Sequence, residues 1–395
     1  MAETVADTCR KIAEATGPDD IFESLGNNNQ GRAQRLKRLQ EEYERLSGIL
    51  AVDTSNVEAP ALKKIKEAKI TLDELYVWAK SKIVADDPVA DNQKPAQTGS
   101  VPSLTNEIKI STKKRDYYIT EGLSTNDLSV VYKGYYLEDT MPVDVAVKIT
   151  RNPSDNAFAK REATALELLY SAPNNEGRQL KHLPKLLDQF TTSDNQRANI
   201  LTTQDGYDLN AVKEKYGTGV DRKHMVWMLN RLLSVAGYAH SRGVIHGNIT
   251  PANLTIRPRD HNLWLLDWGC SMINSAGNGA KFFVFNEEFS APEIEKRPEL
   301  PPMAQCASQA EVLYLGALFS ADIYSIGKCM IYILGGDIKT NEVPDTVEMP
   351  LRRFLESLVL ESPLQRPRDA WETHGQLRRI ITQLWGKREF LEFRM

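Results

Sequence analysis

The chain has 395 residues, of which 41% are hydrophobic and 26% are charged, so it can form a large core together with a smaller module. Its 49 basic and 53 acidic residues give a formal net charge of -4, which argues against nonspecific binding of nucleic acid or other polyanions. We expect two domains.

The start of the chain and its cysteines indicate a protein inside the cell. The first residues, Met-Ala-Glu-Thr, lack the basic and apolar regions of a secretion signal, and no apolar run is as long as a membrane span. Cys9, Cys270, Cys306 and Cys329 are widely spaced without a Cys-x-x-Cys pair, which argues against a zinc site or a disulfide framework. We therefore predict a cytoplasmic protein that does not contact a membrane.

Residues 1–85 are predicted to form a helical domain. Within a strongly charged stretch, apolar residues recur at helical spacing at Leu36, Leu39, Tyr43 and Leu46. Pro60 is a favoured first-turn residue, and the helix that it would begin buries a second apolar stripe. The members of that stripe are Leu62, Ile65, Leu72, Leu75, Tyr76 and Ala79. Two such stripes can face each other.

The order of these elements resembles a J-domain, the co-chaperone module that stimulates heat-shock chaperone ATPases. The resemblance covers residues of about 18 to 84, with an initial segment from Asp20 to Gly26, a charged helix, a loop and a second helix. After its charged helix that family carries His-Pro-Asp, whereas residues 50–53 here read Leu-Ala-Val-Asp, which argues against chaperone stimulation. The alternative is a helical hairpin that serves as a docking surface for another protein.

A polar segment separates this domain from the rest of the chain. Residues 86–110 are rich in Asp, Asn, Gln, Pro, Ser and Thr and are predicted to be a linker. Residues 130–136 and 143–149 then have the β-branched and aromatic composition of strands, and residues 158–169 return to helical spacing. Beyond residue 205 the apolar segments are mainly helical, including residues 225–240 and 323–334. We predict an α+β, bilobal fold, with a small antiparallel-sheet lobe at 111–204 before a larger helical lobe at 205–395.

Several motifs follow one another through the two predicted lobes. Residues 145–148 read Val-Ala-Val-Lys, and Glu162 lies in the next predicted helix. Residues 246–253 read His-Gly-Asn-Ile-Thr-Pro-Ala-Asn, and residues 267–269 read Asp-Trp-Gly. Each alone would be weak evidence, because a lone Lys or Glu is usually a solvated charge. In this order they resemble the protein-kinase superfamily, over residues of about 115 to 385.

The resemblance implies a nucleotide site with named residues. In the V-A-I-K position, Lys148 would contact the α and β phosphates of ATP, and Glu162 would hold that lysine in place. Asn253 and Asp267 would be the ligands of Mg²⁺, an ion that prefers oxygen donors and bridges the phosphates. The cofactors implied are therefore ATP and Mg²⁺.

Other motifs resemble parts of the family that build the helical lobe. Residues 290–293 match the Ala-Pro-Glu motif, and Arg366 resembles the buried arginine that pairs with its glutamate. Asp322, at the start of a predicted helix, resembles the aspartate that supports the backbone of the catalytic loop. These roles are structural and do not bear on turnover.

The loop over the phosphates departs from the family pattern. The family has G-x-G-x-x-G, whereas Ser124, Asn126 and Ser129 stand where those glycines belong. Side chains would crowd the approach to the phosphates, and Asp127 adds a charge of the wrong sign. We expect a lower nucleotide affinity, or a loop that sits further away.

The resemblance makes His246 and Asn248 the candidate catalytic positions, and the loop departs from the family at the proton acceptor itself. After His246, Gly247 and Asn248 replace Arg-Asp, and the amide of Asn248 has no ionisable oxygen that could take a proton from a substrate hydroxyl. Thr250 replaces the lysine that steadies the γ-phosphate in protein-serine/threonine kinases. Losing the general base alone costs roughly 10² to 10⁴ in rate, and losing a positioned cation adds to this.

The leading hypothesis is a pseudokinase that binds ATP and Mg²⁺ and acts as a switch or scaffold, with a protein partner on the N-terminal helices or the helical lobe. The first alternative is a divergent enzyme, either a slow kinase or a nucleotide transferase, with Asp127 and Asp144 as candidates for unusual roles. The second is an adaptor that binds no nucleotide. Residues 246–248 and 266–269 also resemble segments of small-molecule kinases such as choline phosphotransferases, but these enzymes rely on the same missing aspartate.

Two segments of the helical lobe have no assigned role. Residues 281–285, Lys-Phe-Phe-Val-Phe, form either a packed strand or a docking face, and burial is the usual fate of such aromatic runs. The stretch after Glu293, with Pro298, Pro301 and Pro302, is predicted to be a surface excursion.

Overall fold

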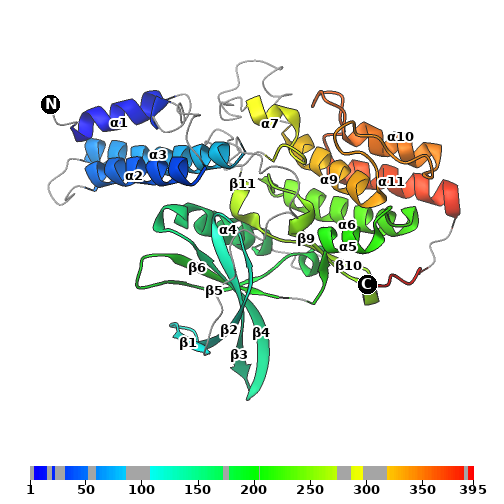
Figure 1. Cartoon of the computed structure of the whole chain (residues 1–395), viewed down its shortest axis with the longest axis horizontal. Helices are drawn as coiled ribbons and strands as arrows, with labels where there is room; N and C mark the ends of the chain where they lie inside the picture. Colours follow the sequence, from blue (N-terminus) through cyan, green and yellow to red (C-terminus); the bar gives the residue numbers. More distant parts are fainter. Residues whose placement is uncertain are drawn as a thin grey trace.

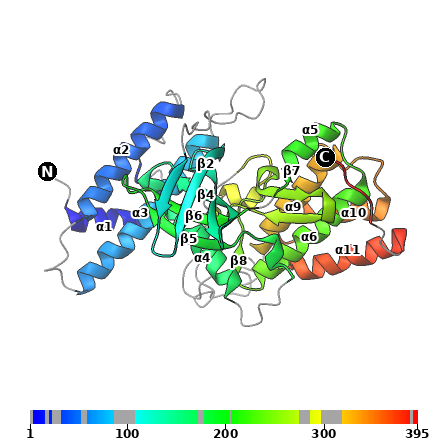
Figure 2. The same ribbon diagram turned by 90° about the horizontal axis from the view of Figure 1, so that it is seen from below.

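The chain forms a helical module and two lobes. The computed structural model describes residues 4–15, 20–22, 32–51, 59–85, 107–171, 178–203, 205–273, 286–296, 318–386 and 390–395. In Figure 1 the helical module and the larger helical lobe lie along the upper part of the molecule, and the sheet extends below them. Figure 2 shows the sheet between the module and the helical lobe when the molecule is seen from below.

The N-terminal module consists of three described helices around its own core. They are α1 (Val5–Glu14), α2 (Arg32–Leu50) and α3 (Ala59–Ala85). The Thr4 hydroxyl caps α1 by accepting a hydrogen bond from the Asp7 amide at 3.2 Å. The two apolar stripes predicted from the sequence meet here, with Leu39 and Leu46 of α2 and Leu72 of α3 buried in one cluster. The predicted helical character of this region is confirmed for the described residues; residues 23–31 and 52–58 lie outside them.

The small lobe is built on a curled antiparallel sheet. Within the described ranges, six strands follow the order β1-β2-β3-β4-β6-β5. Their bounds are β1 Ile108–Ser111, β2 Asp116–Thr125, β3 Ser129–Glu138, β4 Met141–Thr150, β5 Leu186–Thr191 and β6 Arg197–Thr202. Alternating residues such as Val145 and Val147 of β4 are fully buried against Ile200 of β6, as period-two burial in strands requires. The first strand begins at Ile108, near the end of the stretch predicted as linker; residues 86–106 lie outside the described residues.

One helix of the small lobe covers the sheet and reaches the site. The short 3-10 turn η3 (Pro153–Asp155) leads into α4 (Asn156–Tyr170), whose buried face includes Phe158, Glu162 and Leu166. A second turn, η4 (Leu180–His182), precedes β5. The His182 ring nitrogen Nδ1 lies 2.8 Å from the Leu263 carbonyl, which ties this lobe to the next.

The large lobe is mainly helical. Its helices are α5 (Leu209–Tyr216), α6 (Arg222–His240), α7 (Pro292–Lys296), α9 (Phe319–Leu334), α10 (Met349–Leu358) and α11 (Ala370–Trp385). Helices α6 and α9 form the centre of this lobe, and nearly every residue of α9 is buried. None of the helices that the structure describes is both long and apolar enough to cross a membrane.

Short strands and 3-10 turns flank the loops of this lobe between residues 207 and 273. They are β7 (Tyr207–Asp208), β8 (Val244–Ile245), η5 (Pro251–Asn253), β9 (Leu254–Arg257), η6 (Pro258–Asp260), β10 (Asn262–Leu265), η7 (Trp268–Cys270) and β11 (Met272–Ile273). The predicted bilobal α+β fold is confirmed. Residues 281–285 and the proline-rich stretch at 298–302 lie outside the described residues, so their predicted packing stays a prediction.

Candidate functional site

An ion-pair network joins three of the predicted site residues. The Lys148 ammonium on β4 lies 3.0 Å from Glu162 Oε1 on α4 and 2.6 Å from Asp267 Oδ1, which follows β10. Asn199 on β6 donates from Nδ2 to Glu162 Oε2 at 2.9 Å, so both oxygens of that carboxylate have a partner. Strand, helix and loop therefore meet at one cation.

The electrostatics of this network keep Lys148 and Asp267 charged. Burial on its own would lower the pKa of Lys148, but the Asp267 and Glu162 carboxylates outweigh it and raise that pKa above its usual value. For Asp267, burial would raise the pKa, and the Lys148 ammonium outweighs that effect and holds it below the usual range. The lysine is thus held as a fixed positive charge near the position where the resemblance places phosphates.

The backbone at Asp267 aims its carboxylate at that cation. Asp267 has φ of 61°, in the left-handed region that non-glycine residues rarely adopt. The next residue, Trp268, is fully buried, and its indole nitrogen donates to the Leu265 carbonyl at 3.0 Å. Its ring also packs edge-on against His246, with 4.7 Å between the ring centroids. Tryptophan thus anchors the turn by packing and by a hydrogen bond.

Helix α9 holds the loop at 246–253 in place through the side chain of Asp322. The buried Asp322 carboxylate accepts hydrogen bonds from the backbone amides of His246 at 2.8 Å and Gly247 at 2.9 Å. The His240 ring nitrogen Nε2 contacts the same carboxylate at 3.0 Å. Burial on its own would raise the pKa of Asp322, but the contact with His240 and the backbone amides hold it below its usual range. Asp322 therefore lies where the resemblance implied that a supporting carboxylate would be.

His246, a predicted catalytic residue, has both ring nitrogens in contact with backbone. Its Nε2 lies 2.9 Å from the Leu266 carbonyl, and its Nδ1 accepts from the Asn248 amide at 3.3 Å. Burial lowers the pKa of this imidazole, which favours the neutral ring. Because neither nitrogen is left over, the geometry suits a role in holding the loop more than a role in proton transfer.

The two asparagines of the loop are linked to each other. Asn253 donates from Nδ2 to the Asn248 carbonyl at 2.9 Å, while the Leu266 amide donates to the Asn253 carbonyl at 2.8 Å. This arrangement leaves the side-chain oxygen of Asn253 as the donor atom for a metal ion. Within the described ranges, no group of three or more His, Cys, Asp or Glu side chains is placed to hold a metal. A magnesium ion held by Asp267 and Asn253 would complete its shell with water and nucleotide oxygens.

The turn between β2 and β3 lies over the ion-pair network and is tight. Asn126 Oδ1 accepts from the amides of Leu128 at 2.9 Å and Ser129 at 2.8 Å, as in an Asx turn. The Asn126 amide donates to the Ser129 carbonyl, and the Arg151 amide donates to the Leu128 carbonyl, both at 2.9 Å. Side-chain acceptors thus replace the bare glycine backbone that the family uses.

This turn closes the space above the network. A cavity of only about 20 Å³ remains there, which is room for about one water molecule. Leu128 packs against Phe158 of α4 and Cys270 of η7. The residues that line the cavity are Asn126, Leu128, Ser129, Lys148, Thr150, Phe158, Ala159 and Asp267. While Leu128 keeps these contacts, this cavity is too small for a phosphate group.

The structure brings together most, but not all, of the predicted site. Asn126 and Ser129 line the cavity with Lys148 and Asp267, whereas Ser124 is exposed on β2, paired with Val131, and is not among the lining residues. Asn248 and Asn253 are not among the lining residues either. They lie in the neighbouring loop, where the Asn253 side chain donates to the Asn248 carbonyl.

Sequence reasoning missed Leu128, Phe158 and Asn199. For two of them, the sequence contains a feature that could have indicated their role. Leu128 is a large apolar residue in an otherwise polar turn, and Asn199 is a polar residue inside a buried strand.

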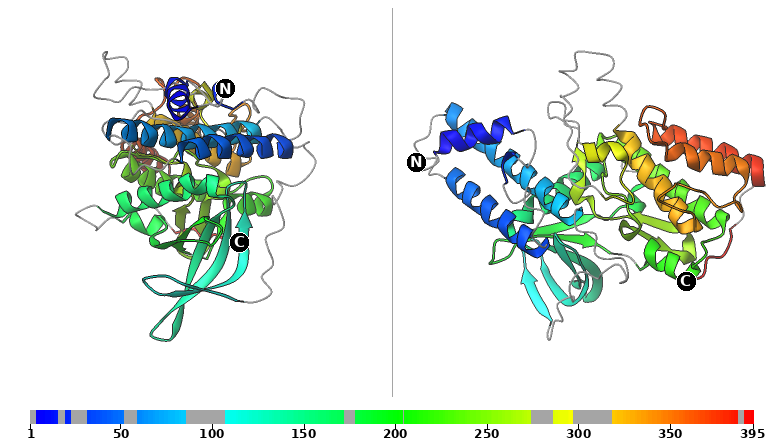
Figure 3. Two further views of the ribbon diagram at one scale, coloured as in Figure 1. Left: turned by 90° about the vertical axis from the view of Figure 1, so that its left-hand side faces the viewer. Right: turned by 45° about the horizontal axis from the view of Figure 1, so that its top comes forward.

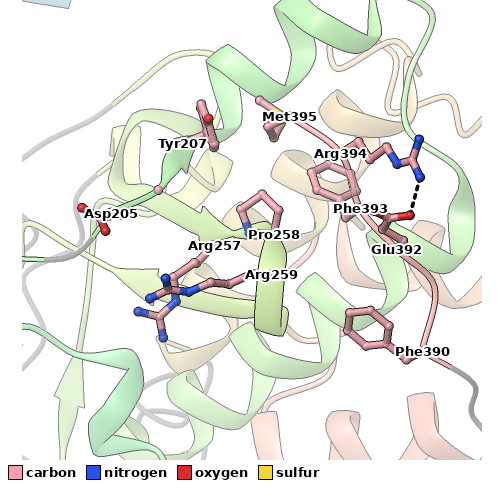
Figure 4. Close-up of a pocket in the computed structure, with 11 residues that line it drawn as sticks. Asp205, Tyr207, Arg257, Pro258, Arg259, Phe390, Glu392, Phe393, Arg394 and Met395 are labelled. Atoms are coloured by element: carbon pink, nitrogen blue, oxygen red, sulfur yellow. Dashed lines mark hydrogen bonds and ion pairs between the residues drawn. The ribbon is translucent and has the colours of Figure 1, made fainter.

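A second and larger cavity, of about 770 Å³, lies in the large lobe (Figure 4). It is lined by residues 205–207, by the end of β9 with η6, and by residues 390–395. Two of its arginines already have carboxylate partners, since Arg257 contacts Asp260 at 2.7 Å and Arg394 contacts Glu392 at 2.6 Å. It does not include the Lys148 network, so we place the candidate site at the smaller cavity.

Comparison with known proteins decides the family. The model of the protein kinase domain matches residues 126–367, which is more than half of the chain. The chain belongs to the protein kinase domain family. The large-lobe geometry agrees, because Arg366 contacts the Glu293 carboxylate of the Ala-Pro-Glu motif in a buried ion pair.

Individual relatives are distant. Serine/threonine-protein kinase F of Synechocystis sp. is 26% identical over 228 residues, which are 54% of this chain and 43% of that protein. Sperm motility kinase 2B of Mus musculus is 28% identical over 157 residues, 38% of this chain and 32% of that protein. The chain thus spans less than half the length of both.

A solved structure supports the fold. The crystal structure of the BubR1 kinase domain superposes with a TM-score of 0.51 at 14% identity, covering 72% of this chain and 86% of that one. At this identity the similarity bears on the fold alone. This chain has Asn248 in the loop, Thr250 after it, and an Asx turn at 126–128.

Proposed function

We propose that this protein kinase family member is a pseudokinase, which works as a regulated switch or scaffold and not as an efficient phosphotransferase. The observation that carries the proposal is Asn248 on an otherwise supported loop. The backbone amides of His246 and Gly247 before it donate to Asp322, and its own backbone amide donates to His246 Nδ1. Its side chain is an amide that cannot accept a proton. His246 cannot easily substitute, since both of its nitrogens contact backbone groups.

The size of the expected rate loss is large. Loss of general-base catalysis costs roughly 10² to 10⁴, and Thr250 offers no cation to the transferring phosphoryl group, which costs a similar electrostatic factor. We infer that transfer by the wild-type chain is slower than ordinary kinase turnover by roughly 10⁴ or more.

ATP with Mg²⁺ is the ligand that the site fits best. Lys148 is held positively charged by its two carboxylate partners, which suits it to phosphate oxygens. Asp267 and the free side-chain oxygen of Asn253 are hard donors of the type that Mg²⁺ prefers. Asp267 must exchange its partner on binding, because it now contacts Lys148 directly at 2.6 Å.

Binding also requires the turn at 126–128 to open. Leu128 must leave its contact with Phe158 and Cys270, and the cost of opening lowers the apparent affinity by the fraction of open molecules. We infer a weak nucleotide site. The helical module at 1–85 supplies the second half of the proposed role as a docking surface for another protein, and no stimulation of a chaperone is proposed.

Parallel binding and transfer assays on the wild type, Asn248→Asp and Asp267→Ala test the proposal. We expect the wild type to bind ATP with Mg²⁺ without transferring phosphate to itself or to a generic substrate. Asn248→Asp should gain transfer, and Asp267→Ala should lose binding. Ordinary turnover by the wild type that Asp267→Ala abolishes would overturn the proposal.

The closed cavity also favours a second candidate, an adaptor that binds no nucleotide. A ligand that binds only the native state raises apparent stability by RT ln(1 + [L]/Kd). A thermal-shift titration therefore separates the two candidates, because an adaptor shows no shift with millimolar ATP and Mg²⁺, whereas a weak binder shows one.

A further inference from the structure

The helical module touches the small lobe at the start of α4. Tyr76 of α3 is 1% exposed, and the Ser154 hydroxyl of η3 donates to its phenolic oxygen at 3.2 Å. In Figures 1 and 3, the helical module lies on the side of the small lobe that carries α4. A side chain of the N-terminal domain is thus bonded to the segment that leads into the helix of the candidate site.

Both sides of this contact are buried. Ser154 is 6% exposed and Asp155, the residue before α4, is fully buried. The Asp155 charge contributes to raising the pKa of Tyr76, after burial itself, so the two side chains lie close together. Tyr76 is in turn held by its own domain, because its ring packs at 4.4 Å from Tyr43 and at 6.3 Å, edge-on, from Phe22. The contact joins two ordered cores.

The first turn of α4 connects this contact to the site. Phe158, four residues after Ser154, packs against Leu128 of the turn and Cys270 of η7. The carbonyl of Ala159 accepts from Asn199 Nδ2 at 2.8 Å, and the same amide group bonds Glu162. Glu162 then holds Lys148 at 3.0 Å. Each step from Tyr76 to Lys148 is a direct contact or a short path along η3 and the first turns of α4.

We propose that the N-terminal helical module is an intramolecular clamp on the first turn of α4, which holds Glu162 against Lys148 and couples the docking of the module to the nucleotide site. Packed elements with two discrete arrangements carry such coupling, and the coupling acts equally in both directions. A change at Tyr76 is therefore felt at Lys148, and a ligand at Lys148 is felt at the module.

Two hydroxyl deletions isolate the contact in the full-length chain. Tyr76→Phe keeps the ring packed against Tyr43 and Phe22 and removes only the acceptor, while Ser154→Ala removes the donor. The matched control is Tyr135→Phe, which removes a tyrosine hydroxyl that donates to Glu107 at 2.9 Å elsewhere in the small lobe.

Amide hydrogen exchange measures the effect of this contact on α4 in the absence of a ligand. In Tyr76→Phe and Ser154→Ala, we expect the amides of residues 158–163 to exchange about fivefold faster, as loss of one buried hydrogen bond predicts, with α6 unchanged as an internal reference. The double variant should exchange no faster than either single variant, because both remove the same bond. Tyr135→Phe should match the wild type.

The outcomes distinguish the clamp from a mere anchor. If exchange rises only in α3, or in neither helix, the contact holds the module in place without acting on α4, and the proposal is wrong.

The coupling to nucleotide rests on the proposed function and is measured separately. Titration with ATP and Mg²⁺ should give a Kd about fivefold higher in Tyr76→Phe than in the wild type or Tyr135→Phe. If the wild type binds no ATP, the proposed nucleotide binding fails, while the exchange measurement still decides the clamp. If ATP binds equally well to all three proteins, the clamp does not reach the site and the coupling is overturned.

Discussion

The loop at 246–253 and the turn at 126–128 both depart from the kinase pattern, but they do so in different ways. In the loop, the backbone is held by Asp322 and His246, and the departure is a change of side chain at Asn248. In the turn, Asn126 and Ser129 build a different backbone arrangement, held by an Asx turn and by Arg151. In the loop, only a side chain differs, on a backbone that keeps its support. In the turn, the backbone conformation itself differs.

This difference determines what a single substitution can do. A carboxylate placed at residue 248 would arrive on a backbone that is already fixed, so one change can restore the missing group. In the turn, glycine at one position would not restore an open loop, because Leu128 would still pack on Phe158 and Cys270. Binding and chemistry should therefore respond to mutation independently.

The largest expected effect comes from removing the support of the loop. Asp322→Ala deletes a buried acceptor of two backbone amides and the partner of His240, which should cost roughly 4 kcal/mol in the free energy of unfolding. Urea unfolding monitored by tryptophan fluorescence measures it. Asp322→Asn should cost less, because one acceptor oxygen remains.

An exposed carboxylate provides the control for that loss. Asp345 contacts Arg352 at 2.6 Å, but its side chain is 97% exposed, and solvent screens such pairs. Asp345→Ala should leave the urea midpoint unchanged. If Asp322→Ala proved equally silent, the loop would not depend on α9 for its shape, and the comparison between loop and turn would lose its basis.

The next effect concerns β10, the strand that leads to Asp267. Burial lowers the pKa of His182 from 6.5 to about 4, and the ring contacts the Leu263 carbonyl on β10. Because the folded state prefers the neutral ring, this contribution is complete above pH 6.5 and is lost as the pH falls toward 4, by roughly 3 kcal/mol.

The difference between two proteins isolates this titration. His182→Asn places an amide nitrogen near the position of Nδ1 and has no group that titrates, so its stability should fall less between pH 6.5 and 4 than that of the wild type. Other buried histidines titrate in both proteins and cancel in the difference. Parallel stability curves for the two proteins would contradict the assignment.

A smaller effect is expected in the turn. Asn126→Ala removes the acceptor of two backbone amides, those of Leu128 and Ser129, and should lower the free energy of unfolding by about 1 kcal/mol. Because the closed turn becomes less favourable, the affinity for ATP should rise severalfold at the same time. Calorimetric titration alongside urea unfolding measures both. A loss of affinity would show that the closed turn helps to bind the nucleotide.

Much of the architecture could be predicted from the sequence, because it depends on periodic patterns and ordered motifs. The stripes at Leu39 and Leu72, the strand that carries Lys148 and the helix that begins near Asp322 all follow from local spacing. The pairing of Lys148 with Glu162 could be predicted from the order of the motifs. The direct contact of Lys148 with Asp267 could not, since that distance depends on how the two lobes pack.

The closed turn and the Tyr76 contact could not be predicted from the same patterns. Tyr76 belongs to the apolar stripe of α3, and nothing in helical spacing distinguishes a residue that serves one core from a residue that also touches the next domain. Leu128 stood in a stretch aligned with a glycine-rich loop, and the Asx turn that redirects it depends on the Asn126 side chain. Long-range contacts of this kind arise from tertiary packing.

The smallest expected change in stability is at the residue with the largest expected change in chemistry. The contacts that hold residue 248 involve its backbone amide and carbonyl, which Asn248→Asp leaves in place. The side chain is half-buried and similar in size, so the free energy of unfolding should change by less than about 0.5 kcal/mol at neutral pH. Urea unfolding of this variant beside the wild type measures it. A loss of several kcal/mol would mean that the loop does not tolerate a charge at residue 248, and a single substitution could then not restore the missing group.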